Sequence, residues 1–175
     1  MRVSVVILVG LVLGSLAWLA GCDVIFDDGD SDYVCPGDRL PPRNQHRVTI
    51  GQGIWGDVWF WDGDFMPPCP SGSVTAVSRE IRIHELTSLD QVVVHPELHP
   101  AFYTEVVSSL IATTWSDSDG FFEAELDAGM YSVFAIEDSL YFANGSDGYG
   151  NIWPIEVVDG EVSETLFHID YLKTW

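Results

Sequence analysis

The chain has 175 residues, enough for one domain with a hydrophobic core, since a chain of about 150 residues buries roughly 70% of its unfolded surface. It combines 47% hydrophobic residues with a formal net charge of -20, from 27 acidic and 7 basic residues. The hydrophobic fraction excludes a disordered acidic tail, and the scarcity of lysine and arginine excludes nucleic acid as a partner.

The N-terminus has the composition of a secretion signal. A short basic start precedes an uninterrupted apolar stretch, which ends in LAGC at residues 19–22. This tetrapeptide resembles the bacterial lipobox, whose cysteine is acylated and becomes the first residue after cleavage. The resemblance implies a lipoprotein signal peptide at residues 1–21, a palmitate-type lipid on Cys22, and a domain outside the cytoplasm at the cell membrane or outer membrane. An uncleaved transmembrane anchor is the alternative, because about 20 apolar residues can span a bilayer.

Residues 22–47 mix aspartate, glycine and proline without periodicity, which predicts a solvated acidic tether between the lipid and the domain. Once Cys22 is acylated, Cys35 and Cys69 are the two remaining cysteines. In an oxidising compartment we expect them to form a disulfide bond, and a reactive thiol is the alternative. The folded domain is predicted to span residues 48–175.

Alternating apolar and polar residues within this domain predict strand after strand, and no capped helical stretch is found. In REIRIHEL, for example, Ile81 and Ile83 face the core while Arg82 and His84 face water. About seven strands are expected, which is typical of a single small Greek-key β-sandwich. They fall within residues 53–61, 79–86, 105–115, 121–126, 129–138, 152–158 and 164–171.

Two of these segments carry finer expectations. Residues 105–115 have aliphatic and β-branched side chains on both faces, which indicates a central strand. Residues 121–138 read as a hairpin, in which Phe122 and Val133 face the core and a turn at residues 127–129 reverses the chain.

The stretch SDSDG at residues 116–120 raises the question of a calcium loop. An EF-hand loop built around Gly120 would use Asp117 and Asp119, but its first and last positions hold tryptophan and leucine. A tight turn is therefore expected, in which the aspartates bond the local backbone and Gly120 supplies a positive φ angle. A weaker calcium hypothesis remains, in which Asp117 and Asp119 share an ion with aspartate-rich loops at residues 27–32 and 62–64.

The same stretch resembles the signature of the carboxypeptidase regulatory-like domain, a transthyretin-like β-sandwich. That signature runs Thr/Ser-Asp, two residues, Gly, any residue, an aromatic residue, and then Leu-x-x-Gly-x-Tyr. Residues 116–122 match its first part, and Leu126, Gly129 and Tyr131 match its second. The resemblance implies a transthyretin-like fold and an accessory or spacer role without an active site.

The best catalytic candidate is HPELHP, with His95, Glu97 and His99. Zinc proteases carry two histidines four apart on one helix face, with glutamate directly after the first histidine. Pro96 and Pro100 oppose a regular helix here, so we expect a polar loop, with a metal-dependent hydrolase as the alternative. Transthyretin-like enzymes use a His-x-His pair or a terminal Tyr-Arg-Gly-Ser, and the chain has neither. We therefore expect no catalysis.

Trp55, Trp59 and Trp61 fall on one face of a predicted strand. If that face is exposed to solvent, the rings could stack on sugars. The alternative is that the strand is buried on both faces or that residues 87–105 cover it. The sequence thus predicts a non-catalytic, lipid-anchored envelope lipoprotein whose sandwich is an accessory or binding module for a protein or glycan. A purely structural spacer is a further alternative.

Overall fold

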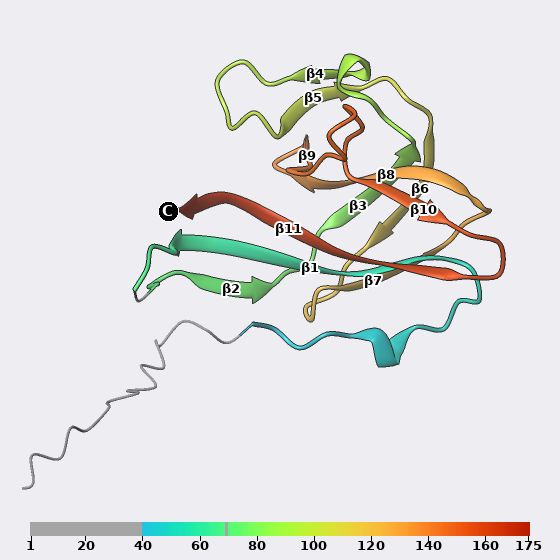
Figure 1. The fold of residues 1–175 in the computed structure, drawn as a ribbon, viewed down its shortest axis with the longest axis horizontal. Helices are drawn as coiled ribbons and strands as arrows, with labels where there is room; N and C mark the ends of the chain where they lie inside the picture. Colours follow the sequence, from blue (N-terminus) through green and yellow to red (C-terminus); the bar gives the residue numbers. More distant parts are fainter. Residues whose placement is uncertain (1–39, 69) are drawn as a thin grey trace, which may run out of the picture. The chain divides into compact units, whose positions relative to one another are not determined.

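The computed structural model describes residues 40–68 and 70–175, which belong to one compact unit. The described residues form strands and two short 3-10 helices, without an α-helix, and the strands make two sheets (Figure 1). The all-β class predicted from the sequence is confirmed. Outside the described residues lie the predicted signal peptide, most of the predicted tether including the aspartates at 27–32, and Cys22, Cys35 and Cys69.

Sheet A contains β1 (Gly53–Asp64), β2 (Ser73–Ala76), β7 (Phe121–Glu125) and β11 (Val162–Thr174). β1 is its central strand, and β11 runs parallel to β1 along its whole length. The other edge of β1 is shared, because β7 pairs antiparallel with its first half and β2 with its second half. Every other strand of sheet A is therefore hydrogen-bonded directly to β1.

Sheet B contains β3 (Glu80–Glu85), β4 (Val92–Val94), β5 (Phe102–Val106), β6 (Leu110–Trp115), β8 (Gly129–Glu137), β9 (Leu140–Phe142) and β10 (Pro154–Val157). Its order is β4-β5-β9-β8-β3-β6, and β10 pairs with the part of β8 that β9 leaves free. The 3-10 helices η1 (Gln45–Arg47) and η2 (Leu89–Gln91) precede β1 and β4.

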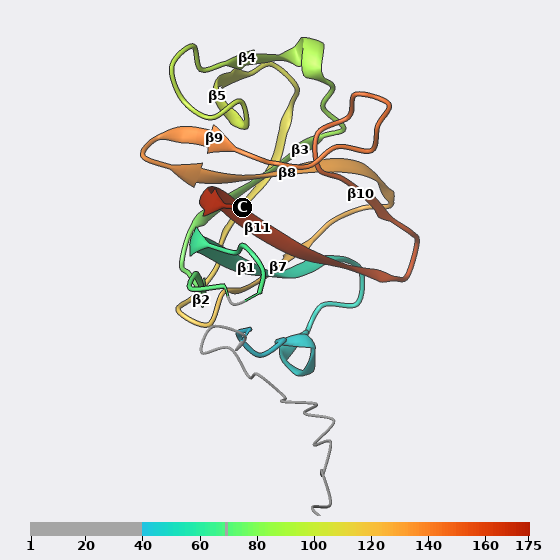
Figure 2. The same cartoon turned by 60° about the vertical axis from the view of Figure 1, so that its left-hand side comes forward.

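The two sheets enclose one hydrophobic core (Figure 2). The core-facing sides predicted for β3, β7 and β11 are confirmed, because Ile81, Phe122 and Phe167 all point inward and are at most 1% exposed. Burying a large apolar side chain of this kind stabilises a fold by about 1.5–3 kcal/mol. The fully buried core residues include Ile54, Val58, Ile81, Ile83, Val133, Phe142, Phe167 and Ile169.

The predicted hairpin at residues 121–138 is wrong. β7 pairs with β1 in sheet A, whereas β8 pairs with β3, β9 and β10 in sheet B. The turn between them therefore carries the chain from one sheet to the other. Alternation fixes which face of a strand is apolar but does not name the partner strand, so a hairpin and a crossing between sheets give the same pattern.

The predicted central strand at residues 105–115 is also wrong, because the chain divides there into β5 and β6. β6 pairs only with β3 and lies at the edge of sheet B, where Leu110 is 51% exposed. The count of about seven strands omitted the short strands β2, β4 and β9, whose three or four residues leave little periodicity to read. His84, expected on a wet face, is only 2% exposed because the rings of Phe134 and Tyr141 pack against it.

Candidate functional site

The outer surface of sheet A, turned away from the core, carries a group of aromatic side chains. Alternation along β1 places Trp55, Trp59 and Trp61 there, opposite Ile54 and Val58. We call this surface the aromatic face; its members are Trp55, Trp59, Trp61, Phe65, His168, Lys173 and Trp175.

His168 lies at the centre of the aromatic face because the parallel pairing of β1 and β11 sets it directly beside Trp59. Its ring stacks on Trp59 with centroids 6.4 Å apart, and it meets Trp61 at 5.3 Å. Trp61 also packs against Phe65 of the β1–β2 loop, at 5.2 Å. The rings therefore form one continuous aromatic surface that reaches the open end of the sheet.

The aromatic face is covered at one end and open at the other. Trp55 and Trp59 are each 3% exposed, and the guanidinium carbon of Arg43 lies 5.7 Å from each ring centroid. Their cover thus includes Arg43, from the segment before β1. At the other end Trp61 is partly exposed and Trp175 is 75% exposed. Only this open end offers rings for stacking, so the three predicted tryptophans are not equivalent.

Three buried ring nitrogens on the aromatic face lack a hydrogen-bond partner: Trp59 Nε1, Trp61 Nε1 and His168 Nε2. Leaving a buried donor unsatisfied costs about 1–3 kcal/mol, and folded proteins rarely leave such groups unpaired. Because these atoms are buried, a ligand on the surface does not reach them, so the candidate contacts are the exposed rings at the open end and not these nitrogens.

Lys173 is the only lysine of the chain, and its ammonium lies among three rings of the aromatic face. Its Nζ is 3.8 Å from the ring centroid of Trp175, 4.5 Å from that of Trp61 and 5.1 Å from that of Phe65. In the described part of the chain it forms no ion pair, so its charge is held by cation–π contacts and remains available to an anion.

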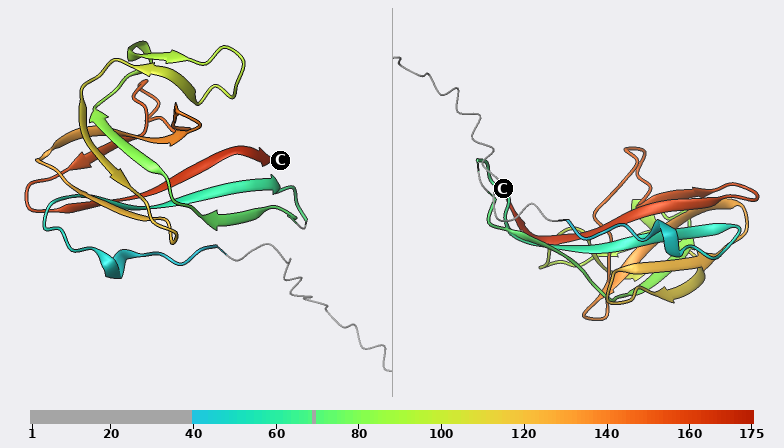
Figure 3. Two further views of the ribbon diagram at one scale, coloured as in Figure 1. Left: turned by 180° about the vertical axis from the view of Figure 1, so that it is seen from behind. Right: turned by 90° about the horizontal axis from the view of Figure 1, so that it is seen from below.

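Residues 43–47, which we call the strap, run along the outside of sheet A (Figure 3). Arg43 Nε lies 2.6 Å from Asp57 Oδ2, and Asn44 Nδ2 donates to Asp57 Oδ1 at 2.7 Å. Asp57 is 0% exposed, so these two donors compensate a fully buried carboxylate. Arg43 also pairs with Glu164 of β11. The sequence predicts that these residues belong to a solvated tether, but the strap is bound through Arg43 to both β1 and β11.

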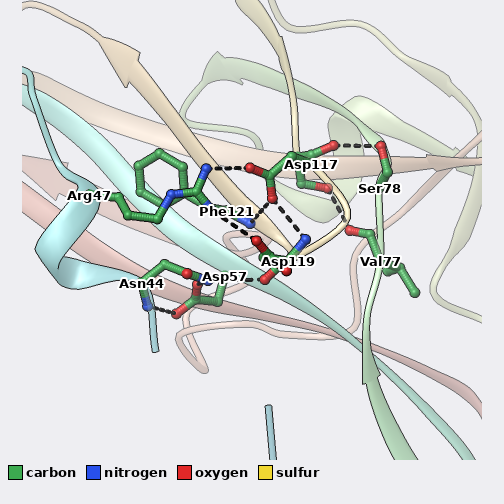
Figure 4. Close-up of polar contacts among 9 residues, drawn as sticks. Asn44, Arg47, Asp57, Val77, Ser78, Asp117, Asp119 and Phe121 are labelled. Atoms are coloured by element: carbon green, nitrogen blue, oxygen red, sulfur yellow. Dashed lines mark hydrogen bonds and ion pairs between the residues drawn. The ribbon is translucent and has the colours of Figure 1, made fainter. Parts of the chain in front are cut away.

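Asp117 and Asp119, the residues of the calcium hypothesis, form a tight turn beside the strap (Figure 4). Asp117 Oδ1 accepts the N–H groups of Asp119 at 2.9 Å and Phe121 at 3.2 Å. Arg47 pairs with Asp117 and reaches Asp119 at 3.6 Å, and its hydrogen bond is the main cause that holds the pKa of Asp117 below its ordinary value. Gly120 has a φ of +79°, as the turn requires. The two carboxylates thus face a guanidinium.

The other proposed ion ligands are not brought together. His95 Nδ1 accepts the N–H of Glu97 at 3.2 Å, and His99 Nδ1 accepts that of Ala101 at 3.3 Å, so both rings bond their own loop between β4 and β5. Within residues 40–68 and 70–175, no three His, Cys, Asp or Glu side chains are grouped to hold a metal. This applies to His95, Glu97 and His99 and to the loops at 62–64 and 117–119.

Burial lowers the pKa of both His84 and His168, so we expect the protein to lose stability in mild acid. The unfolded chain, with histidine pKa values near about 6.5, binds protons more readily than the folded protein. The free energy of unfolding should be constant above about pH 7 and fall as the pH drops below about 6.5. Urea titrations at a series of pH values measure this. Asp117 and Glu123 have lowered pKa values, so their contribution is lost only below about pH 4.

The double variant His84→Gln with His168→Gln is the control for this loss of stability in mild acid. It should show a flat free energy of unfolding between about pH 7 and pH 5.5, because neither buried imidazole remains to be protonated. A wild-type protein equally stable across this range would contradict the expectation.

Sequence reasoning found Trp55, Trp59 and Trp61 but missed the other members of the aromatic face, Phe65, His168, Lys173 and Trp175, and the covering residue Arg43. Alternation in ETLFHIDY could have placed His168 opposite Phe167, on the outer side of its strand. No local signal, however, shows that β11 lies beside β1, or that Arg43 folds back over the tryptophans. Those contacts join segments far apart in the sequence.

Comparison of the chain with protein-family models, with curated proteins and with solved structures finds no match. In the part of the chain that the structure describes, no helix is both long enough and apolar enough to cross a bilayer.

Proposed function

We propose that the protein is a non-catalytic, lipid-anchored lipoprotein of the bacterial cell envelope, whose β-sandwich binds a glycan through the aromatic face. The observation that carries this proposal is the open end of the aromatic face, where Trp61 is partly exposed and Trp175 is 75% exposed beside the ammonium of Lys173. Sugars present apolar ring faces that pack on aromatic rings and hydroxyl groups that form hydrogen bonds with polar side chains such as that of Lys173. Trp61 and Trp175 supply the exposed rings.

The anchoring part of the proposal rests on residues 19–22, whose LAGC sequence resembles a lipobox. We include in it the disulfide bond between Cys35 and Cys69, as expected for a domain outside the cytoplasm. Mass spectrometry of the mature protein, with and without reductant, checks the lipid on Cys22 and the bond together.

The finer description of the fold also belongs to the proposal. The match of residues 116–131 to the carboxypeptidase regulatory-like signature supports a transthyretin-like Greek-key sandwich. The turn at Asp117 and the positive φ of Gly120 are what that signature needs at these positions.

Oligosaccharide binding tests the proposed function. The full-length protein in detergent micelles is titrated calorimetrically with cellotriose, chitotriose and trigalacturonic acid. At least one should bind, and Trp61→Ala should weaken that binding about tenfold, because one stacking ring is lost. Trp115→Ala is the matched control, since Trp115 is 63% exposed on β6 of the other sheet.

Two results would contradict the proposal. Binding of none of the three sugars would favour a structural spacer, which needs no ligand. Equal loss of binding in Trp61→Ala and Trp115→Ala would place the ligand elsewhere. If Trp61→Ala does not fold, Trp175→Ala tests the same surface, because that ring is 75% exposed. A metal-dependent hydrolase using His95, Glu97 and His99 gains no support, since these side chains are not grouped as ligands.

A further inference from the structure

We propose that the aromatic face selects acidic glycans, and that the carboxylate of a uronic acid residue binds beside Lys173 while the sugar ring stacks on Trp61 or Trp175. This inference rests on the proposed function and adds the charge of the ligand to it. It is carried by the position of Lys173, which has no ion pair among the described residues and lies beside the exposed rings of the aromatic face.

Lys173 favours an acceptor that carries negative charge. Its ammonium can only donate hydrogen bonds, and it has no ion pair among the described residues. A neutral hydroxyl can accept one of these hydrogen bonds, but a carboxylate accepts a charge-assisted one, which is roughly twice as strong. The open end of the aromatic face therefore favours an anionic acceptor over a neutral one.

Two cationic side chains, Lys173 and Arg43, contact rings of the aromatic face. Burial and these two positive charges hold the pKa of His168 below its ordinary value, against the opposite effect of Asp170. Arg43 is already paired with Asp57 and Glu164, whereas Lys173 is held by rings alone. Lys173 is thus the cation free to meet a ligand.

The exposed indole rings beside Lys173 favour an anion that also has a ring able to stack, which distinguishes an acidic glycan from other anions. Lys173 lies 4.5 Å from the ring centroid of Trp61 and 3.8 Å from that of Trp175, so an anion at its ammonium is beside two partly or largely exposed indoles. A uronic acid joins a carboxylate to a pyranose ring in one residue and can use both features. A peptide made of aspartate alone supplies the charge but not the ring.

Two ligands with the same sugar chain, one charged and one neutral, test the inference. The full-length protein in detergent is titrated with trigalacturonic acid and with its fully methyl-esterified form. The acid should bind about tenfold more tightly, because one charge-assisted contact replaces a neutral one. Lys173→Gln should bring the two affinities together, whereas Arg82→Gln, on the other sheet, should leave their ratio unchanged.

The outcomes separate this inference from the proposed function. If acid and ester bind equally, or if Lys173→Gln keeps the preference for the acid, the inference is overturned while glycan binding stands. If hexa-aspartate competes as well as the trisaccharide acid, the site selects charge without a sugar ring, which also overturns it. If no sugar binds, both proposals fall. Melting temperatures of the variants establish that each one is folded.

Discussion

Replacing Arg43 by methionine should lower the free energy of unfolding by about 3 kcal/mol at neutral pH, because the buried carboxylate of Asp57 then loses its cation. Asp57 is 0% exposed and would keep only Asn44 as a partner from the strap. Breaking a buried ion pair on one side costs about 3–5 kcal/mol, and the remaining amide donor argues for the low end of that range. Urea unfolding monitored by tryptophan fluorescence measures the change.

Arg82→Met is the matched control for this substitution. Arg82 pairs with Glu80 at 2.7 Å, but Glu80 is 22% exposed and can be hydrated when its partner is lost. We expect a change below about 1 kcal/mol there. The native fluorescence should also respond in Arg43→Met alone, because Arg43 covers Trp55 and Trp59. Equal losses in the two variants would show that the burial of Asp57 does not determine the effect.

Gly56→Val should destabilise the protein by about 3 kcal/mol or more, because the centre of β1 has no room for a side chain. A Cβ at Gly56 would lie 2.5 Å from the carbonyl oxygen of Thr165 and 2.8 Å from the Phe122 ring. The first neighbour is backbone of the adjacent β11 and cannot move without disturbing the sheet. The loss is measured by thermal or urea unfolding.

Gly51→Val provides the comparison, since no atom lies within 4 Å of a Cβ built at Gly51. It should change the free energy of unfolding by no more than about 0.5 kcal/mol. If Gly56→Val were as stable as Gly51→Val, the close packing of Thr165 and Phe122 over β1 would be wrong. A glycine inside a strand commonly marks such a close approach.

The sequence was sufficient to predict the faces of strands but not their neighbours. The period of two placed Ile81, Phe122 and Phe167 in the core, because one wet and one dry face leave a pattern within each strand. The choice of partner strand leaves no such pattern in the sequence. The hairpin expected at residues 121–138 therefore became a crossing between sheets, and the segment at 105–115 became two strands.

The candidate site was predictable to the same extent. The spacing of Trp55, Trp59 and Trp61 is a local property, and it assigned them to one face. Their exposure is not local, because it depends on Arg43 and on the pairing of β1 with β11. His168 and Lys173 belong to the site only through that pairing, so reading each strand alone could not include them.

The parallel pairing of β1 with β11 also sets the order in which the protein can fold. The hydrogen bond from Thr174 to Gly63 closes a loop of 111 residues, and β11 follows every other strand in the chain. A growing chain, or one passing through a membrane, therefore cannot complete sheet A until β11 has emerged. Until then one whole edge of β1 lacks its partner, and unpaired apolar edges promote aggregation. Within this unpaired edge of β1, Asp57 and the weak strand former Gly56 interrupt the run of apolar residues, as gatekeeper residues do.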